Sequence, residues 1–194
     1  MSTTVLFACD AVRATELTEH DLPALQQFFE ANADYFELVN GGPPPPGEAA
    51  EEMRGALPAG WPYTKKWIIG LHDDAGSLRA MANVVSDLLA SGVWHVGTYI
   101  VDRRWRGTGA AHRWYGALEA WAQRNGARWM RLGVVAGNAR AEGFWAACGY
   151  REVRQRTGIE MGARVNTVRV LVKSLGGGDF GEYVALVPRD RPDP

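Results

Sequence analysis

Residues 93–121 combine three segments whose order strongly limits the fold of this chain. The first, VWHVGTYIV at 93–101, is apolar and rich in β-branched residues, which predicts a buried strand. The second, RRWRGTG at 103–109, places two glycines among arginines. The third predicts a helix with one buried face, because apolar residues recur at three- and four-residue steps: Ala111, Trp114, Leu118 and Trp121. A strand joined to a helix through a glycine loop is typical of folds that mix both elements around one sheet.

The flanking segments alternate in a similar way. A short strand at 14–18 leads to Thr18, which can cap a helix with apolar positions at Leu22, Leu25, Phe28 and Phe29. A second helix is expected from EAAEEMRGAL at 48–57, and residues 65–89 predict a hairpin that turns at 73–76. Strand 129–135 and a helix ending at Gly149 follow, and then strands around 151–157 and 167–175. The sequence therefore predicts an α/β fold with helices packed against a mixed sheet.

Length and composition indicate one globular domain. The chain has 194 residues, of which 46% are apolar and 22% charged, as in ordinary globular proteins. We expect this domain to span residues 1–175. The glycine- and proline-rich segment 176–194 is expected to be a tail that is draped on the surface or disordered.

Charge and residue usage argue against several classes of function. The net charge of −1 gives the whole molecule no electrostatic attraction to nucleic acid or to an anionic membrane surface. No apolar run reaches the length of a membrane span, and no secretory signal precedes the domain, so a cytoplasmic location is expected. The four histidines and two cysteines are scattered without ligand spacing, so no metal site is expected.

The glycine loop has the chemistry of an anion site. Unpaired N–H groups gather at a helix N-terminus, where the helix dipole also favours negative charge. Glycines at 107 and 109 would let a phosphate approach the backbone closely, although a plain turn with solvated arginines would have the same short sequence. The patterns of a P-loop and of a dinucleotide-binding fingerprint are both absent.

Two motifs in residues 93–150 together resemble the GNAT superfamily of acyl-CoA-dependent N-acetyltransferases. The pyrophosphate motif of these enzymes, Arg/Gln-x-x-Gly-x-Gly/Ala, is matched by Arg106-Gly107-Thr108-Gly109-Ala110-Ala111. A downstream motif, Asn-x-x-Ala-x-x-Phe-Tyr/Trp-x-x-x-Gly-Phe/Tyr, is matched by Asn138, Ala141, Phe144, Trp145, Gly149 and Tyr150. The resemblance implies a mostly antiparallel central sheet flanked by helices, with acetyl-CoA as co-substrate.

The resemblance also implies roles for individual positions. Backbone amides of residues 107–111 would hold the CoA pyrophosphate, with Arg106 or its neighbours near its phosphates. Ile100 and Val101 would pair with the pantetheine arm through main-chain hydrogen bonds, leaving one N–H to polarise the thioester carbonyl. Asn138 would approach the pantetheine, and Phe144 and Trp145 would line its wall.

The catalytic groups are less clear from the sequence. Many GNAT enzymes have a tyrosine after the phenylalanine that protonates the leaving thiolate, and an indole at Trp145 cannot do so. Tyr150 is an alternative acid. His95 is the first candidate for the general base, on the strand face that the period of two shares with Gly97 and Tyr99, and Asp87 is the second.

The resemblance implies that the acceptor is a primary amine of a small molecule or peptide, and that this amine attacks the thioester directly in a ternary complex. Tyr35 and Glu37 belong to a region that resembles the acceptor-side wall of these enzymes, so they are expected to contact the acceptor. A non-catalytic CoA-binding regulatory module is the alternative, because the acid and the base are both uncertain. The strand at 167–175 and the glycine-rich tail could pair across a twofold axis, which would make the protein a homodimer.

Overall fold

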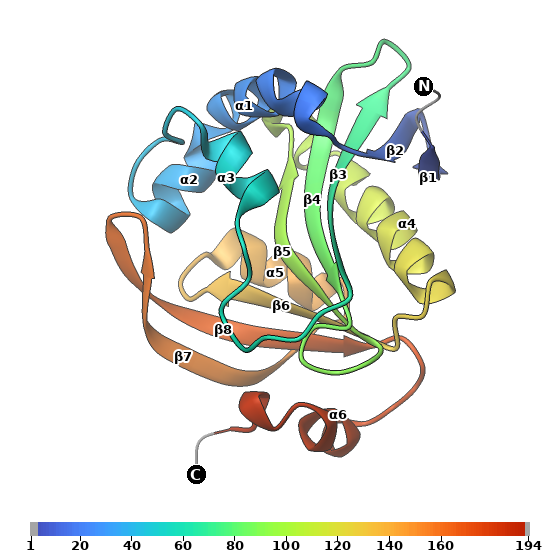
Figure 1. Ribbon diagram of the computed structural model, residues 1–194, viewed down its shortest axis with the longest axis vertical. Coiled ribbons are helices and arrows are strands. Elements are labelled where there is room, and N and C mark those ends of the chain that lie inside the picture. The colour runs from blue at the N-terminus through green and yellow to red at the C-terminus, as the bar shows by residue number, and fades with distance from the viewer. Residues whose placement is uncertain (1–3, 193–194) are drawn as a thin grey trace.

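The computed structural model describes residues 4–192, which form one eight-stranded sheet with helices on both faces (Figure 1). The strands are β1 (Val5–Cys9), β2 (Val12–Glu16), β3 (Lys65–Asp73), β4 (Leu78–Ser86), β5 (Val93–Val101), β6 (Trp129–Val135), β7 (Arg151–Met161) and β8 (Arg164–Ser174). The helices are α1 (Leu22–Ala31), α2 (Ala33–Asn40), α3 (Glu48–Arg54), α4 (Ala110–Arg124), α5 (Ala139–Ala147) and α6 (Phe180–Leu186). Short 3-10 turns occupy η1 (Glu19–Asp21), η2 (Arg103–Trp105) and η3 (Pro188–Asp190).

The sheet is mostly antiparallel, as expected. Its strand order is β1-β2-β3-β4-β5-β6-β8-β7, and β5 and β6 are the parallel pair. A parallel pair needs a crossover connection, and α4 supplies it. The crossover places the N-terminus of α4 beside the end of β5, which is the geometry that the glycine loop predicted.

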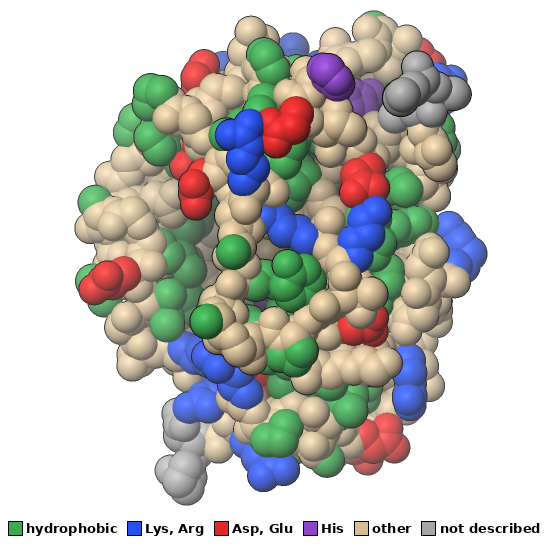
Figure 2. Space-filling view, in the orientation of Figure 1, with side chains coloured by type: hydrophobic (Ala, Val, Ile, Leu, Met, Phe, Trp, Pro, Cys, Tyr) green, Lys and Arg blue, Asp and Glu red, His purple; other side chains and the backbone are tan. Residues whose placement is uncertain are grey.

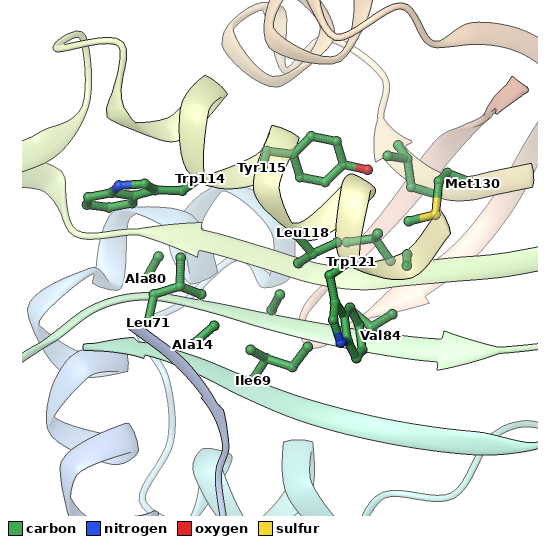
Figure 3. Packing of buried hydrophobic residues seen from close by; sticks show 14 of the residues in the cluster. Ala14, Ile69, Leu71, Ala80, Val84, Trp114, Tyr115, Leu118, Trp121 and Met130 are labelled. Atoms are coloured by element: carbon green, nitrogen blue, oxygen red, sulfur yellow. The ribbon is translucent and has the colours of Figure 1, made fainter. Parts of the chain in front are cut away.

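The larger core lies between the sheet and α4. Trp114, Leu118 and Trp121 extend from α4 toward the strands, as Figure 3 shows, and all three are buried. The ring of Trp121 packs edge-on against Trp67 at 5.4 Å and Trp94 at 5.5 Å. This packing confirms the helical period predicted for the segment after the glycine loop.

The opposite face of the sheet is covered by α1, α2 and α3. The Thr18 N–H donates to Asp21 Oδ2 at 2.7 Å, so the predicted cap precedes α1, whose Leu25 and Phe29 enter the second core. Helix α2 ends at Gly41, which has a φ of 83° and so adopts the left-handed conformation that glycine tolerates. The prolines that follow carry the chain to α3.

Both ends of the described chain contain structure that the sequence did not predict. The N-terminal residues form a hairpin of β1 and β2 at the sheet edge, where only one short strand was expected. The segment expected to be a loose tail contains α6 and η3, with the side chains of Tyr183 and Asp190 fully buried. The apolar contacts of Tyr183 and Val187 with Trp129 explain why this segment packs against the sheet.

The predicted pairing of strand 167–175 with a second copy is wrong for β8, whereas the homodimer itself stays a prediction. β8 lies between β6 and β7 and is hydrogen-bonded on both sides. A strand with two neighbours has no open edge for a second copy, and the sheet edges are β1 and β7.

Strands β5 and β6 pair only over their first halves. The parallel register runs from Val93 opposite Trp129 to Val96 opposite Leu132 and then ends. At the same point the register of β5 against β4 shifts by one residue at Gly97, as in a β-bulge. The two strands therefore diverge beyond this point, and a cavity opens between them.

Candidate functional site

The cavity between β5 and β6 has a volume of about 1040 Å³. Its walls include the unpaired edges of both strands, from Gly97 to Val101 and from Gly133 to Val135. Unpaired N–H and C=O groups on a strand edge can hydrogen-bond an extended ligand with amide groups of its own. Ile100 and Val101 lie on this edge, so the position predicted for a pantetheine contact faces the cavity.

The glycine loop closes one end of the cavity. Gly107 and Gly109 have φ angles of 81° and 80°, which an L side chain rarely adopts. Within residues 4–192, the N–H groups of Gly107, Gly109 and Ala111 donate to no other protein group, whereas the N–H of Ala110 reaches Thr108 Oγ1 at 3.3 Å. Three free donors at the N-terminus of a fifteen-residue helix suit a bound anion.

Arg106 lines the cavity and also links the end of β5 to the helices beside it. Its Nε donates to the Val101 carbonyl at 2.8 Å, its Nη2 donates to Asn32 Oδ1 at 2.9 Å, and its Nη1 pairs with Asp34. The guanidinium thus ties the end of β5 to α1 and α2. The resemblance implied that Arg106 or its neighbours lie near the phosphates, and in the structure Arg106 lines the cavity while it also makes these three contacts.

The wall opposite β5 comes from α5. Asn138 caps this helix by accepting from the Ala141 N–H at 3.1 Å, and Phe144 and Trp145 extend from the helix into the cavity lining. The Trp145 ring packs edge-on against Tyr115 at 4.8 Å and is 7% exposed. Trp145 is therefore mainly a packing residue at this position.

His95 lines the cavity beside Arg131 of the neighbouring strand. Arg131 Nη1 lies 3.3 Å from His95 Nδ1, and because a guanidinium can only donate, Nδ1 accepts and the neutral ring carries its proton on Nε2. Burial, followed by the charge of Arg131, lowers the pKa of His95 to about 3. The ring is thus a weak base and a good N–H donor near neutral pH.

The bulge at Gly97 breaks the period of two that the sequence suggested for β5. Tyr99 faces α4, where its hydroxyl donates to the Ala111 carbonyl at 2.9 Å, while His95 faces Arg131. The expectation that His95, Gly97 and Tyr99 share one face is therefore wrong, because one inserted residue reverses the alternation.

The other candidates from the sequence lie in different places. Tyr35 lines the cavity, and burial raises its pKa, so it stays a neutral phenol. Glu37 of the same helix is exposed and outside the cavity lining. Asp87 lies in the β4–β5 turn, where its Oδ1 accepts from the Gly92 N–H at 2.7 Å. Tyr150 is 5% exposed and hydrogen-bonds Tyr115 beneath α5.

Sequence analysis missed a group of arginines at the other end of the cavity, which we call the arginine cluster: Arg131, Arg156 and Arg189. Arg131 Nε donates to Asp190 Oδ2 at 2.6 Å, and Arg156 Nη2 donates to Asp190 Oδ1 at 3.0 Å. The Arg189 guanidinium lies 4.3 Å above the ring of Trp61. The sequence feature that could have indicated this cluster is Arg131, a lone charge in the apolar strand WMRLGVV.

No group of three or more histidine, cysteine, aspartate or glutamate residues within 4–192 is arranged to hold a metal ion. No helix in this range has both the length and the apolar character that crossing a membrane requires.

Comparisons with known proteins agree with this geometry. The Acetyltransferase (GNAT) family matches residues 25–150, which is more than half of the chain. Among curated proteins, none matches this sequence.

Solved structures share the fold at low sequence identity. An acetyltransferase from Thermus thermophilus is 17% identical, with a TM-score of 0.66 over 86% of this chain and 99% of that one. A spermidine N-acetyltransferase from Vibrio cholerae, in complex with CoA and spermine, is 12% identical, with a TM-score of 0.65 over 84% and 95%. The ribosomal-protein-S18-alanine N-acetyltransferase from Escherichia coli is 15% identical, with a TM-score of 0.61 over 87% and 97%.

The two sequence motifs, the parted strands β5 and β6 and the free amides of the glycine loop lie within or beside the matched region. With the family match over residues 25–150, they show that this chain belongs to the acetyltransferase (GNAT) family.

Proposed function

We propose that this protein transfers an acetyl group from acetyl-CoA to a primary amine by direct attack in a ternary complex. The observation that carries the proposal is the single cavity between β5 and β6, because it connects the glycine loop to the arginine cluster. A donor held at one end and an acceptor at the other would meet where the strands part.

In this proposal the donor lies along the open edge of β5. The free amides of Gly107, Gly109 and Ala111 bind the pyrophosphate of CoA. The edge from Gly97 to Val101 pairs with the pantetheine amides, and a remaining N–H polarises the thioester carbonyl. Phe144 and Trp145 cover the arm from the side of α5.

The reaction needs no covalent enzyme intermediate. The amine nitrogen forms a bond to the carbonyl carbon, the carbon–sulfur bond breaks, and its electron pair leaves with sulfur. The nitrogen loses one proton to cavity water and the CoA thiolate gains one, which gives the N-acetyl amine and free CoA. Cys148 is outside the cavity lining, and burial raises the pKa of its thiol to about 11, so it is poorly suited to act as a nucleophile.

His95 serves this reaction as a donor in our proposal. Its Nδ1 is held by Arg131 and its low pKa disfavours a second proton, so the Nε2–H is the group offered to the bound acceptor. We assign no catalytic role to Asp87 or Tyr150, because both hydrogen-bond away from the cavity.

The binding site for acetyl-CoA is tested by substituting two glycines, one in the glycine loop and one elsewhere on α4. Gly109→Trp puts an indole at the free amides, in a backbone conformation with positive φ, and should abolish acetyl-CoA binding measured by calorimetry. Gly116→Trp is the control, because Gly116 is exposed on the same helix and an added Cβ there meets nothing within 4 Å.

Three outcomes separate the possible functions. Binding lost in Gly109→Trp and retained in Gly116→Trp, together with amine-dependent release of CoA, supports the transferase. Binding with no release for any amine would point to the non-catalytic CoA-binding module, which the tryptophan at position 145 favours. Unchanged affinity in a folded Gly109→Trp variant would refute the loop assignment.

A further inference from the structure

The acceptor end of the cavity carries more positive than negative charge. Arg131, Arg156 and Arg189 all line this end, and the carboxylate within their reach is that of Asp190. Asp190 is fully buried behind the lining, where it also accepts a hydrogen bond from the Tyr183 hydroxyl at 2.7 Å. Among residues 4–192, one carboxylate faces three guanidinium groups, so the described residues give this end of the cavity an excess of positive charge.

Hydrogen-bond donors of the arginine cluster remain available at Arg189. The three guanidinium nitrogens of Arg131 already contact Asp190 and His95. Arg156 Nε has no partner among the described residues, but it is buried and so is not open to a ligand. The Arg189 guanidinium donates to no residue within 4–192 and contacts the face of Trp61. Stacking leaves the N–H edge of a guanidinium open to a planar anion.

The charges of the cluster affect one another. Burial, and then the charges of Arg156 and Arg131, lower the pKa of Arg189. A bound anion would relieve this repulsion. Basic side chains also gather on the surface near the C-terminal end of the chain, as the space-filling view shows (Figure 2).

Apolar groups line the same cavity. The Trp61 ring lies against Arg189 and Arg131, and Leu38, Pro58, Ile159 and Met161 also belong to the lining. An acceptor that fits would carry an anionic group for the arginines, an apolar body for this wall, and the amine that reacts.

We propose that the arginine cluster binds a carboxylate of the acceptor, so that the substrate is an amine bearing both a carboxylate and an apolar body, as in an apolar α-amino acid. This inference depends on the proposed transferase function. A polycationic amine would be repelled by the same charges, which separates this chain from the spermidine N-acetyltransferase that shares its fold.

Matched acceptors test the charge requirement. Release of CoA from acetyl-CoA is measured with L-leucine, its amide L-leucinamide and its decarboxylated amine 3-methylbutan-1-amine. The acid, the amide and the decarboxylated amine of phenylalanine and of tryptophan are measured in the same way, and putrescine serves as the cationic acceptor. The free amino acids should have the highest kcat/KM. The amides have the more acidic ammonium group and so more neutral amine at pH 7, which biases the comparison against this result. The aminophosphonate analogue of leucine distinguishes a carboxylate site from a general oxyanion site.

Variants locate the effect at the cluster. Arg189→Gln should raise KM for the amino acid about 10- to 100-fold, as expected for one lost charge-assisted contact, with kcat nearly unchanged. It should leave KM for the amide within about threefold, because a neutral group makes the weaker contact. Arg189→Glu should move the preference toward putrescine. Arg124→Gln is the control, because Arg124 is exposed on α4 and outside the cavity lining.

The outcomes separate the two proposals. If amides or simple amines are acetylated as well as the amino acids, or if Arg189→Gln affects amide and acid equally, the carboxylate site is refuted and the transferase stands. If acetyl-CoA does not bind to the folded protein, the proposed function fails. If acetyl-CoA binds and the panel is inert while another amine without an anionic group reacts, the carboxylate site alone is refuted. If acetyl-CoA binds and no amine reacts at all, both proposals fail.

Discussion

Removing the Asp190 carboxylate should destabilise the protein through the core beneath the C-terminal segment. Asp190 accepts hydrogen bonds from three different elements: Arg131 of β6 at 2.6 and 3.0 Å, Arg156 of β7 at 3.0 Å, and Tyr183 of α6 at 2.7 Å. In Asp190→Ala the Arg131 guanidinium, which is 5% exposed, would keep its charge without this partner. The substitution therefore leaves a buried cation unpaired.

The expected loss is large for a single residue of a terminal segment. Breaking a buried ion pair by removing one partner costs about 3–5 kcal/mol of the free energy of unfolding. For a chain of this size, each kcal/mol shifts the melting temperature by about 2–4 °C, so Asp190→Ala should melt roughly 6–20 °C below the unsubstituted protein.

Urea and thermal unfolding followed by circular dichroism measure this loss. Asp179→Ala is the control in the same segment, because Asp179 only caps α6 by accepting from the Glu182 N–H at 3.0 Å, and losing a cap costs about 1 kcal/mol. The double variant with Arg131→Met and Asp190→Leu should recover part of the stability, since it removes the buried unpaired charge at position 131 while Tyr183 and Arg156 still lack their acceptor. If Asp190→Ala costs no more than Asp179→Ala, the C-terminal segment does not pack as described and the reasoning is refuted.

Three more predictions concern acid stability, packing and the role of an excluded candidate. Burial raises the pKa of Asp190, but the hydrogen bonds and charge of Arg131, with the hydrogen bonds of Tyr183 and Arg156, outweigh this and lower it to about 2. The native state should therefore lose about 2 kcal/mol as the pH falls from about 5 to below 2, measured by urea unfolding at each pH. Trp145→Ala removes a ring that is 7% exposed and should cost about 3–5 kcal/mol in the same assay, and a much smaller loss would instead indicate a loosely packed site. Asp87→Asn keeps an acceptor for the Gly92 N–H, and asparagine tolerates the positive φ at that position. The free energy of unfolding should therefore change little, and kcat should stay within about twofold. A large fall in kcat would return Asp87 to the catalytic candidates.

Local sequence signals were sufficient to predict several elements, including those around the glycine loop. The apolar spacing on α4, the cap at Thr18 and the turn at 73–76 each depend on residues close together in the chain, and each is found where it was expected. The loop itself follows from two glycines, because positive φ angles at 107 and 109 are nearly forbidden to other residues.

Features that depend on distant contacts could not be obtained in this way. The bulge at Gly97 reverses which alternate residues of β5 face α4. No residue pattern in VWHVGTYIV predicts that the register with β4 shifts there. The structured C-terminal segment is another case. Its sequence is rich in glycine and proline, and its stability comes from Trp129 and Arg131, about fifty residues earlier in the chain.

The sequence by itself therefore determined the fold class, the family motifs and the glycine loop that we propose binds the CoA pyrophosphate, because these are encoded by spacing within short segments. Only the tertiary structure decided the acceptor end of the cavity. Arg131, Arg156 and Arg189 come from β6, β7 and η3. They lie together around Asp190 because β8 pairs between β6 and β7, and because the C-terminal segment packs against this part of the sheet. The pKa of His95 depends on that same assembly, since the neighbouring charge that lowers it belongs to another strand.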